Sequence, residues 1–465
     1  SFSDVAPGAW YSPFVETALT HNVFDKTETF RPNDPILRID MAVMLVRALG
    51  YRQLAASAEG FTMPFSDVTE QRGYVAVAYD IGMVSGTGNG LFAPDASAKR
   101  EEAAAMLVRV YERMTSGTEW LHGFYAFSSY DQRYVTREMD AVSAGWSRLS
   151  YTPERGVYMN TSATEGNHFA VPSSYESITT YLEQGGTPLK LNVYMDNVKS
   201  MAKTVLCDPA LRTAAVDAIM AEVTRVYDRI GKSPYSGVTI DFEALRGEEA
   251  RRGLNAFLAE LGPRLREKQM TLYICVQPVT TTGYYDGFDY KTIGELCDKV
   301  ILMAHDYNAT SLAGFVGSEY YKTTAVTPFN AIYYALRALT DPQTGVADRS
   351  KLALAISFGS VGWKTKDGKL TDPSPVNPAP STIYTRLVQP GSVIGWSEQY
   401  RNPYVSYTTE EGQDIFLWYE DARSVGEKVR LARLMGISGV SVWRIGNIPD
   451  FKDDRIFYDA WSALK

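Results

Sequence analysis

Cysteine and histidine are scarce in this chain, and their scarcity excludes several classes of protein. Three cysteines in 465 residues are an odd number without the close spacings of a disulfide framework or a zinc site. The four histidines are scattered along the sequence. We therefore expect no metal and no cofactor, and we expect the cysteines to be small core residues. The cysteines are Cys207, Cys275 and Cys297.

Excess positive charge and long apolar runs are also missing. The net charge is −8 and the isoelectric point is about 5.3, which argues against nucleic acid or an anionic membrane surface as a partner. No apolar run reaches 18 residues, so the sequence predicts no membrane span. The first residues carry no basic and apolar leader and lie inside a motif, as in a mature secreted product. We therefore expect a secreted protein.

The first 115 residues contain an internal repeat, and the whole length suits two to four domains. Three motifs recur at an offset of 62 to 63 residues: 2–5 at 65–68, 30–33 at 92–95, and 44–47 at 106–109. Each unit is predicted to be a short helix, a turn-rich loop and a second amphipathic helix, such as 40–49. This predicts a small all-α region of two repeats, at 1–52 and 62–115.

The repeats resemble S-layer homology modules, whose signature is represented by 36–40 and 98–102. The resemblance implies that Arg38 and Arg100 bind an anionic secondary polysaccharide of a bacterial cell wall, since a guanidinium can donate two parallel hydrogen bonds to a carboxylate. The alternative is that both arginines are surface residues at helix starts without a ligand. The family modules usually occur in threes, and two are visible here.

After a polar break at 115–119, strand-like and helix-like segments alternate, which is typical of a parallel sheet with crossover helices. Eight strands predict an α/β fold, a (β/α)8 TIM barrel, over 120–465. Helices are predicted between them, for example over 213–229 and 248–267. The expected strands are 121–127, 141–147, 189–195, 237–243, 271–277, 299–305, 351–357 and 438–443.

An α+β insertion is predicted after the seventh strand, at about 362–422. Its proline-rich segment 372–380 cannot be helix or inner strand, and 404–407 with 415–419 predicts a hairpin around 410–412. Six aromatic residues could stack on sugar rings or form the core of the insertion, and both alternatives stay open. They are Trp363, Tyr384, Trp396, Tyr400, Trp418 and Tyr419.

The fourth expected strand, 237–243, carries the most informative chemistry. Alternation puts Thr239, Asp241 and Glu243 on one face, with the two carboxyl groups roughly 6.6 Å apart along the strand. Taken alone, the segment could be an antiparallel strand facing water. In a barrel, Glu243 lies at the catalytic end, and burial beside Asp241 is expected to raise its pKa. Such a glutamic acid donates a proton at neutral pH.

This strand resembles the signature of glycoside hydrolase family 18, the chitinase-like group. Gly237, Asp241 and Glu243 match it, while Ser236 and Thr239 stand where the family has its first two aspartates. Relaxation of these two positions is common in the spore- and wall-associated branch of the family.

Two further barrel strands carry the same resemblance. Segment 302–308 is similar to the sixth-strand motif, with His305 in place of a tyrosine and Asp306 retained. Segment 439–446 is similar to the eighth-strand motif, whose tryptophan, here Trp443, forms the floor of the sugar subsite next to the cleaved bond. The resemblance covers about 121–465.

The resemblance implies a substrate-assisted retaining glycosidase acting on β-linked N-acetylhexosamine polymers such as peptidoglycan or chitin. Glu243 would be the acid, Asp241 would orient the acetamido group, and Asp306 and Trp443 would hold the same sugar. Substrate contacts are also expected from Gln277, His305 and Tyr307, although His305 could equally be a core histidine. The alternatives are a non-catalytic sugar-binding barrel and a structural surface-layer protein. A wall-anchored enzyme at the bacterial cell surface is the interpretation that fits both halves.

Overall fold

The computed structural model describes residues 2–164 and 167–465. It divides into two compact units, residues 1–116 with 433–436, and residues 117–432 with 437–465. The exact domain boundaries that the sequence suggests remain a prediction. Within the described ranges, no helix is long and apolar enough to span a membrane.

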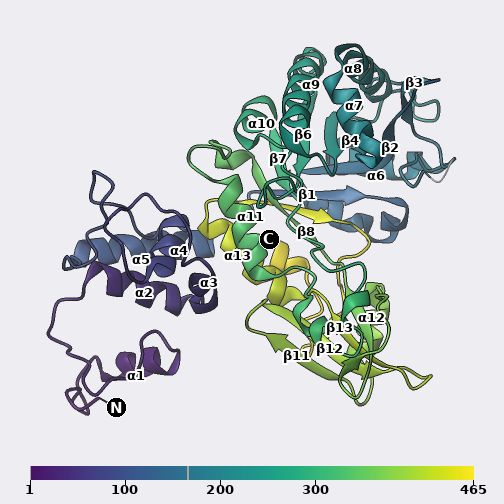
Figure 1. Ribbon diagram of the computed structural model, residues 1–465. Coiled ribbons are helices and arrows are strands. Elements are labelled where there is room, and N and C mark those ends of the chain that lie inside the picture. Colours follow the sequence, from purple (N-terminus) through teal and green to yellow (C-terminus); the bar gives the residue numbers. More distant parts are fainter. Residues whose placement is uncertain (1, 165–166) are drawn as a thin grey trace. The chain divides into compact units, whose positions relative to one another are not determined.

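The first unit contains the two repeats, each built from a short helix, a loop and a longer helix (Figure 1). The same loop geometry recurs in both. Asp4 accepts hydrogen bonds from the backbone N–H groups of Phe30 and Arg31, and Asp67 accepts them from Phe92 and Ala93. In each repeat, this aspartate therefore fixes the loop that leads into the longer helix. The helices are α1 (Ser12–Thr20), α2 (Arg38–Ala48), α3 (Arg52–Ser57), α4 (Arg72–Asp80) and α5 (Arg100–Thr115).

The second unit is a closed barrel of eight parallel strands, which confirms the predicted fold. The strand order is β1-β14-β8-β7-β6-β5-β4-β2, and β2 pairs with β1 to close the sheet. An additional strand β3 (Gly156–Asn160) forms an antiparallel hairpin with β2 that the sequence did not reveal. The barrel strands are β1 (Trp120–Tyr125), β2 (Ala141–Thr152), β4 (Leu189–Met195), β5 (Gly237–Phe242), β6 (Thr271–Val276), β7 (Lys299–Leu302), β8 (Leu352–Ser357) and β14 (Gly439–Trp443).

Helices connect the barrel strands, as the alternating pattern predicts. The helix expected over 213–229 was misplaced. It begins at Pro209, where the Asp208 side chain accepts bonds from two backbone N–H groups, and ends at Val223. These helices are α6 (Tyr175–Gly185), α7 (Met201–Cys207), α8 (Pro209–Val223), α9 (Gly247–Glu267), α10 (Tyr290–Leu296), α11 (Phe329–Leu339) and α13 (Ala422–Leu434). Short 3-10 segments are Phe127–Glu138, Val198–Ser200, Ala313–Phe315, Tyr320–Thr323, Arg349–Lys351 and Trp461–Leu464.

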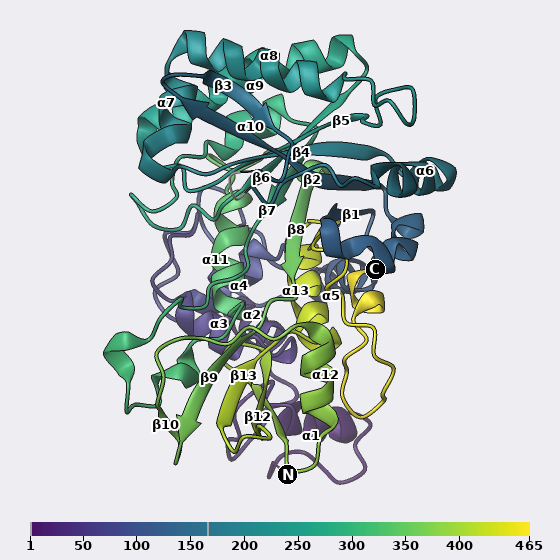
Figure 2. The ribbon, with the colours of Figure 1, turned by 90° about the vertical axis from the view of Figure 1, so that its right-hand side faces the viewer.

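The insertion after β8 is a five-stranded antiparallel sheet with α12 (Pro380–Val388) packed on it (Figure 2). The predicted hairpin is present, with Tyr407 opposite Ile415 and Val405 opposite Leu417. Trp363, Trp418 and Tyr419 are at most 1% exposed, so these three aromatics form core. The strands, in spatial order, are β10 (Lys369–Leu370), β9 (Val361–Lys366), β13 (Asp414–Trp418), β12 (Asn402–Thr408) and β11 (Val393–Ser397).

Candidate active site

Two carboxyl groups lie at the end of the fourth barrel strand. Asp241 is on β5 and is 3% exposed, and Glu243 follows the last residue of β5. The backbone N–H of Glu243 donates to Met195 O on β4, at 2.9 Å, so the glutamate is still held by the sheet. The barrel strand thus presents both acids at its carboxyl end, where barrel enzymes carry their active sites.

Both carboxyl groups bind protons more tightly than usual. Burial raises the pKa of Asp241 to about 6, while Asn192 and the neighbouring thiol of Cys275 act in the opposite direction. Burial, followed by the charge of Asp241, raises the pKa of Glu243 to about 7. Near neutral pH, Glu243 can therefore hold a proton while Asp241 is ionised, which is the division of roles that acid catalysis requires.

Asp241 retains unused hydrogen-bonding capacity. Asn192 Nδ2 on β4 donates to Asp241 Oδ2 at 3.3 Å. None of the described residues donates to Asp241 Oδ1. Because a buried carboxylate oxygen without a donor is unfavourable, this oxygen is suited to accept a hydrogen bond from a bound ligand.

An uncharged chain of hydrogen bonds runs through Thr239. Its hydroxyl pairs with that of Ser143 at 2.6 Å, and the ring of His122 lies between Ser143 and Ser441, at 2.7 and 2.8 Å. Burial lowers the pKa of His122 to about 3, so the ring is neutral. These hydrogen bonds connect strands β5, β2, β1 and β14. Sequence reasoning missed His122, although a histidine inside an expected inner strand was a usable signal.

Asp306 and His305 follow β7 and lie within the electrostatic range of Glu243, whose pKa both charges affect. Asp306 accepts bonds from Ser357 Oγ and from His305 Nδ1, each at 3.0 Å. Although burial opposes it, bonding to His305 and Ser357 keeps the pKa of Asp306 below its usual value. A side chain at Gly359 would come within 2.8 Å of Asp306 Oδ1, which explains a glycine at that position.

The remaining predicted contacts come from three other strand ends. Gln277 follows β6, and its Oε1 accepts the backbone N–H of Ala244 at 2.6 Å, which fixes the residue after Glu243. Trp443 ends β14, is partly exposed, and packs edge-on against Phe124. Tyr307 is 38% exposed. Barrel strands thus bring acids, amide and indole to one end of the sheet, and their roles toward a substrate stay predictions.

The two arginines of the repeats differ in their surroundings. Arg38 is 6% exposed and donates to Phe92 O, Ser85 O and Glu102 Oε1 at 2.9 to 3.0 Å. Neither the predicted polymer contact nor the alternative of a surface residue anticipated this burial. Arg100, its counterpart in the second repeat, is exposed at the first residue of α5.

A metal site is not formed by the described side chains, since they contain no group of three or more His, Cys, Asp or Glu residues that could hold an ion.

Comparisons with known proteins agree with this geometry. Residues 196–447 match the model of glycosyl hydrolases family 18, and residues 1–42 and 64–104 match the S-layer homology domain. A cortical fragment-lytic enzyme of Bacillus anthracis is 24% identical over 317 residues, 66% of this chain and 68% of that one. The Bacillus subtilis protein YdhD is 25% identical over 243 residues, and the chain spans 52% of its length.

Solved structures show the same fold. The spore cortex-lytic enzyme SleL of Bacillus cereus superposes with a TM-score of 0.55 at 19% identity, over 75% of this chain and 74% of that one. A chitinase from Chromobacterium violaceum gives a TM-score of 0.55 at 18% identity, over 74% of this chain and 97% of that one. At these identities the likeness supports the barrel architecture.

The closed (β/α)8 barrel, together with the family match, defines the class as a barrel glycosidase. The chain belongs to glycosyl hydrolases family 18, whose model matches more than half of it. Its two S-layer homology segments are of the kind that anchors proteins to the bacterial cell surface, which confirms the expected location there.

Proposed function

We propose that this protein hydrolyses β-linked glycans that contain N-acetylglucosamine, such as peptidoglycan or chitin-like polymers, by substrate-assisted retaining catalysis. The observation that carries the proposal is the pair of Glu243, with a pKa of about 7, and buried Asp241, with an oxygen that no described residue satisfies. A protonated acid and a neighbouring open acceptor are what this mechanism needs.

The proposed reaction begins when Glu243 donates its proton to the glycosidic oxygen as the bond to the anomeric carbon breaks. The carbonyl oxygen of the substrate's acetamido group forms a bond to that carbon from the opposite side. Asp241 Oδ1 accepts the acetamido N–H and stabilises the positive charge of the cyclic intermediate. Water then attacks the anomeric carbon, whose bond to the acetamido oxygen breaks, and the Glu243 carboxylate takes the proton of the water, which restores the configuration, the acetamido group and the acid.

Other residues are proposed to hold the reacting sugar. The Asp306 carboxylate, fixed by His305 and Ser357, would accept a bond from the sugar, and the partly exposed indole of Trp443 would lie beneath its ring. Tyr307, following the same strand, would contribute its hydroxyl. Gln277 supports the turn after Glu243 through its amide oxygen, and its amide nitrogen would donate to a sugar hydroxyl.

The S-layer homology segments are proposed to hold the enzyme on an anionic polysaccharide of the wall. Arg100 supports this role because it is exposed at a helix start. Arg38 uses its three donor groups within the repeats, so in this proposal it shapes the surface that binds polymer.

Product analysis by mass spectrometry tests the catalytic proposal. The full chain and its Glu243→Gln variant are incubated with purified peptidoglycan and with N-acetylglucosamine oligomers. We expect cleavage by the wild type and a loss of at least about 100-fold in the variant, because glutamine keeps the shape but cannot donate the proton. If neither protein cleaves but both bind sugar, the barrel is a carbohydrate-binding protein without catalysis.

A further inference from the structure

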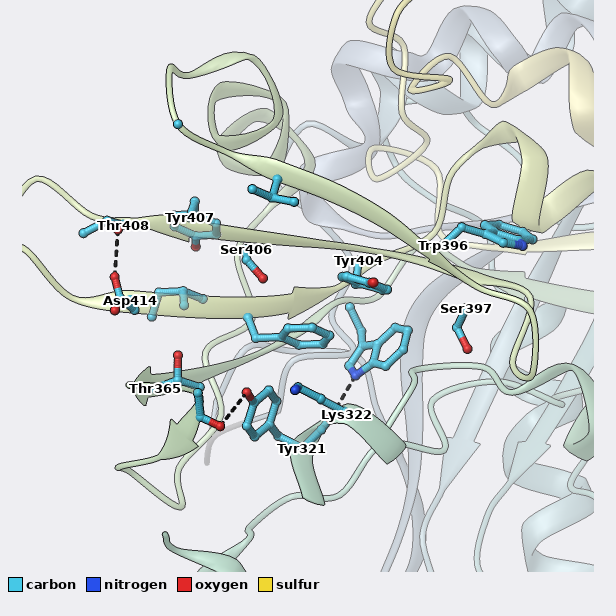
Figure 3. A pocket seen from close by; sticks show the side chains of 16 residues that line it. Tyr321, Lys322, Thr365, Trp396, Ser397, Tyr404, Ser406, Tyr407, Thr408 and Asp414 are labelled. Atoms are coloured by element: carbon cyan, nitrogen blue, oxygen red, sulfur yellow. Dashed lines mark hydrogen bonds between the residues drawn. The ribbon is translucent and has the colours of Figure 1, made fainter. Parts of the chain in front are cut away.

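The insertion carries a groove on one face of its sheet, in addition to the carboxyl groups at the barrel end. Strands β11, β12 and β13 form its base, and Tyr321 and Lys322 from the segment after β7 form a wall (Figure 3). Its volume of about 740 Å³ is in the range of small-molecule and oligosaccharide sites.

The aromatic ring of Tyr404 lies at the base of the groove and is supported from below by buried aromatic rings. Tyr404 is partly exposed and stacks on Phe416, with ring centroids 4.8 Å apart and planes at 22°. Phe416 and Trp418 beside it are 7% and 1% exposed, and Trp418 Nε1 donates to Tyr321 O at 2.9 Å. The Tyr404 ring therefore rests on packed neighbours that prevent it from turning freely.

Gly395 on β11 leaves space for this ring. It lies opposite Tyr404 in the sheet, and a Cβ atom there would come within 2.2 Å of Tyr404 Cζ. The backbone at Gly395 does not need a left-handed conformation, so the glycine is explained by space. Any side chain at this position would displace the ring and obstruct the groove.

The rim of the groove is polar and includes two charged residues. Strand alternation puts Ser406 on the same face as Tyr404, and Figure 3 shows its hydroxyl on the side where Lys322 lies. Lys322 pairs with Glu319 at 2.5 Å, and Asp414 accepts a hydrogen bond from Thr408 at 2.7 Å. Lys322 is thus neutralised, while Asp414 keeps its charge, so these lining residues form no patch of several like charges, which an ionic ligand would require.

An aromatic face bordered by hydroxyl groups is complementary to a pyranose ring. The C–H face of such a ring stacks on an aromatic side chain, and its hydroxyl groups bond to the polar rim. A purely apolar ligand would leave the hydroxyl and amino groups of the rim without water or partners.

We propose that this groove is a second carbohydrate site that binds an uncharged stretch of glycan chain. The proposal rests on the proposed function only for the identity of the polymer, namely the N-acetylglucosamine-containing glycan cleaved at the barrel. A site on the insertion would keep the enzyme on its polymer between cleavage events and would raise its affinity through a second point of attachment.

The test measures binding of the full chain in a Glu243→Gln background, so that the ligand stays intact. The probes are insoluble chitin, purified peptidoglycan and a soluble N-acetylglucosamine hexamer. Tyr404→Ala is expected to weaken retention on the polymer by about 2- to 10-fold, the value of one aromatic contact. Tyr404→Phe keeps the ring and should stay within about twofold of the parent, since it loses one hydroxyl.

A control and a second variant make the result decisive. Tyr384→Ala removes a partly buried tyrosine that does not line the groove. Tyr384 stacks on Phe451 in a separate hydrophobic cluster around α12, so its loss should not change retention. Ser406→Trp fills the groove without removing a core residue and should weaken retention as Tyr404→Ala does. Circular dichroism and thermal unfolding show whether each variant is folded. If Tyr404→Ala is unfolded, retention of Ser406→Trp alone tests the groove site.

Two outcomes separate this proposal from the catalytic one. Retention that is unchanged in folded Tyr404→Ala and in Ser406→Trp overturns the groove site, while cleavage by the wild type would leave the glycosidase standing. Retention that depends on Tyr404, together with a wild type that cleaves none of the probes, supports the groove and rejects the catalytic proposal.

Discussion

Arg38 in the repeats and Asp241 in the barrel are both charged residues of sequence motifs, and both are nearly buried, at 6% and 3% exposure. The Arg38 guanidinium has two carbonyl groups and a carboxylate as partners. Asp241 has one bond from Asn192 and an oxygen that no described residue satisfies. A buried charge whose three nitrogen atoms each have a partner serves the fold, whereas one with a free acceptor is suited to a ligand.

The comparison extends to the two repeats themselves. Arg38 of the first repeat reaches Glu102 of the second, at 2.9 Å. The equivalent residues, Arg100 and Asp40, lie 62 positions away from these partners in the sequence and are both exposed. The same motif position is therefore internal in one repeat and external in the other.

The largest effect is expected from Asp241→Asn, which should reduce hydrolysis by about 100-fold or more because the charge beside the cyclic intermediate is lost. Its effect on stability should have the opposite sign. The folded pKa, about 6, is above the ordinary value of 3.8, so ionisation of Asp241 destabilises the fold as the pH rises from about 4 through 6. The variant should gain about 3 kcal/mol over the wild type at pH 8.

Chemical unfolding at pH 4 and pH 8, beside kinetic assays, checks this prediction. The gain should fall to about 0.5 kcal/mol at pH 4, where the carboxyl group is protonated in the folded state and about half ionised in the unfolded state. A variant that is equally destabilised at both values would mean that Asp241 is a structural residue like Arg38.

Arg38→Met should show the reverse pattern. Removing the guanidinium leaves Glu102 and two carbonyl groups without their donor, which should destabilise the repeats by about 2 kcal/mol, while hydrolysis of soluble oligomers stays unchanged. Hydrogen exchange of peptides from α2 and α5 measures the loss. The double variant with Glu102→Gln is the control, and it should recover part of the stability because the unpaired carboxylate is gone. Unaltered exchange in the single variant would contradict the structural role.

Hydrolysis should have a narrow pH optimum between about 6 and 7. The acid limb follows from protonation of Asp241, and the basic limb from ionisation of Glu243. Because the charge of Asp241 raises the pKa of Glu243, the residual activity of Asp241→Asn should lose its basic limb at a lower pH than the wild type. Profiles of kcat for both proteins test this, and identical basic limbs would show that the two groups are independent.

Local pattern was enough to predict much of the molecule. The strand expected over 189–195 coincides with β4, and β5 ends one residue before the expected limit at 243. The closed barrel and the hairpin of the insertion were also predicted correctly. These features repeat with the period of a strand or of a βα unit, so a short window of sequence contains them.

The surroundings of the carboxyl pair could not be predicted, because each partner comes from a different strand. Asn192 bonds Asp241 from β4, and His122 reaches Thr239 through Ser143. None of these residues is near 237–243 in the sequence. The sequence could not show that Trp363 lies in the core for the same reason. Its neighbours, such as Phe416, come from another strand, and the pairing of the two strands brings them together.

The smallest effect is expected from Arg100→Ala, and it separates the two arginines most sharply. Arg100 is exposed, so its loss should change the free energy of unfolding by less than about 0.5 kcal/mol. If it contacts an anionic wall polysaccharide, sedimentation with purified walls should fall several-fold and the residual binding should be less sensitive to salt. Exposed Lys99→Ala is the matched control for loss of one positive charge at the same helix start. Equal losses in both variants would indicate that general charge attracts the polymer, whereas a loss confined to Arg100 would indicate a specific contact at that position, which the guanidinium can make with two parallel hydrogen bonds.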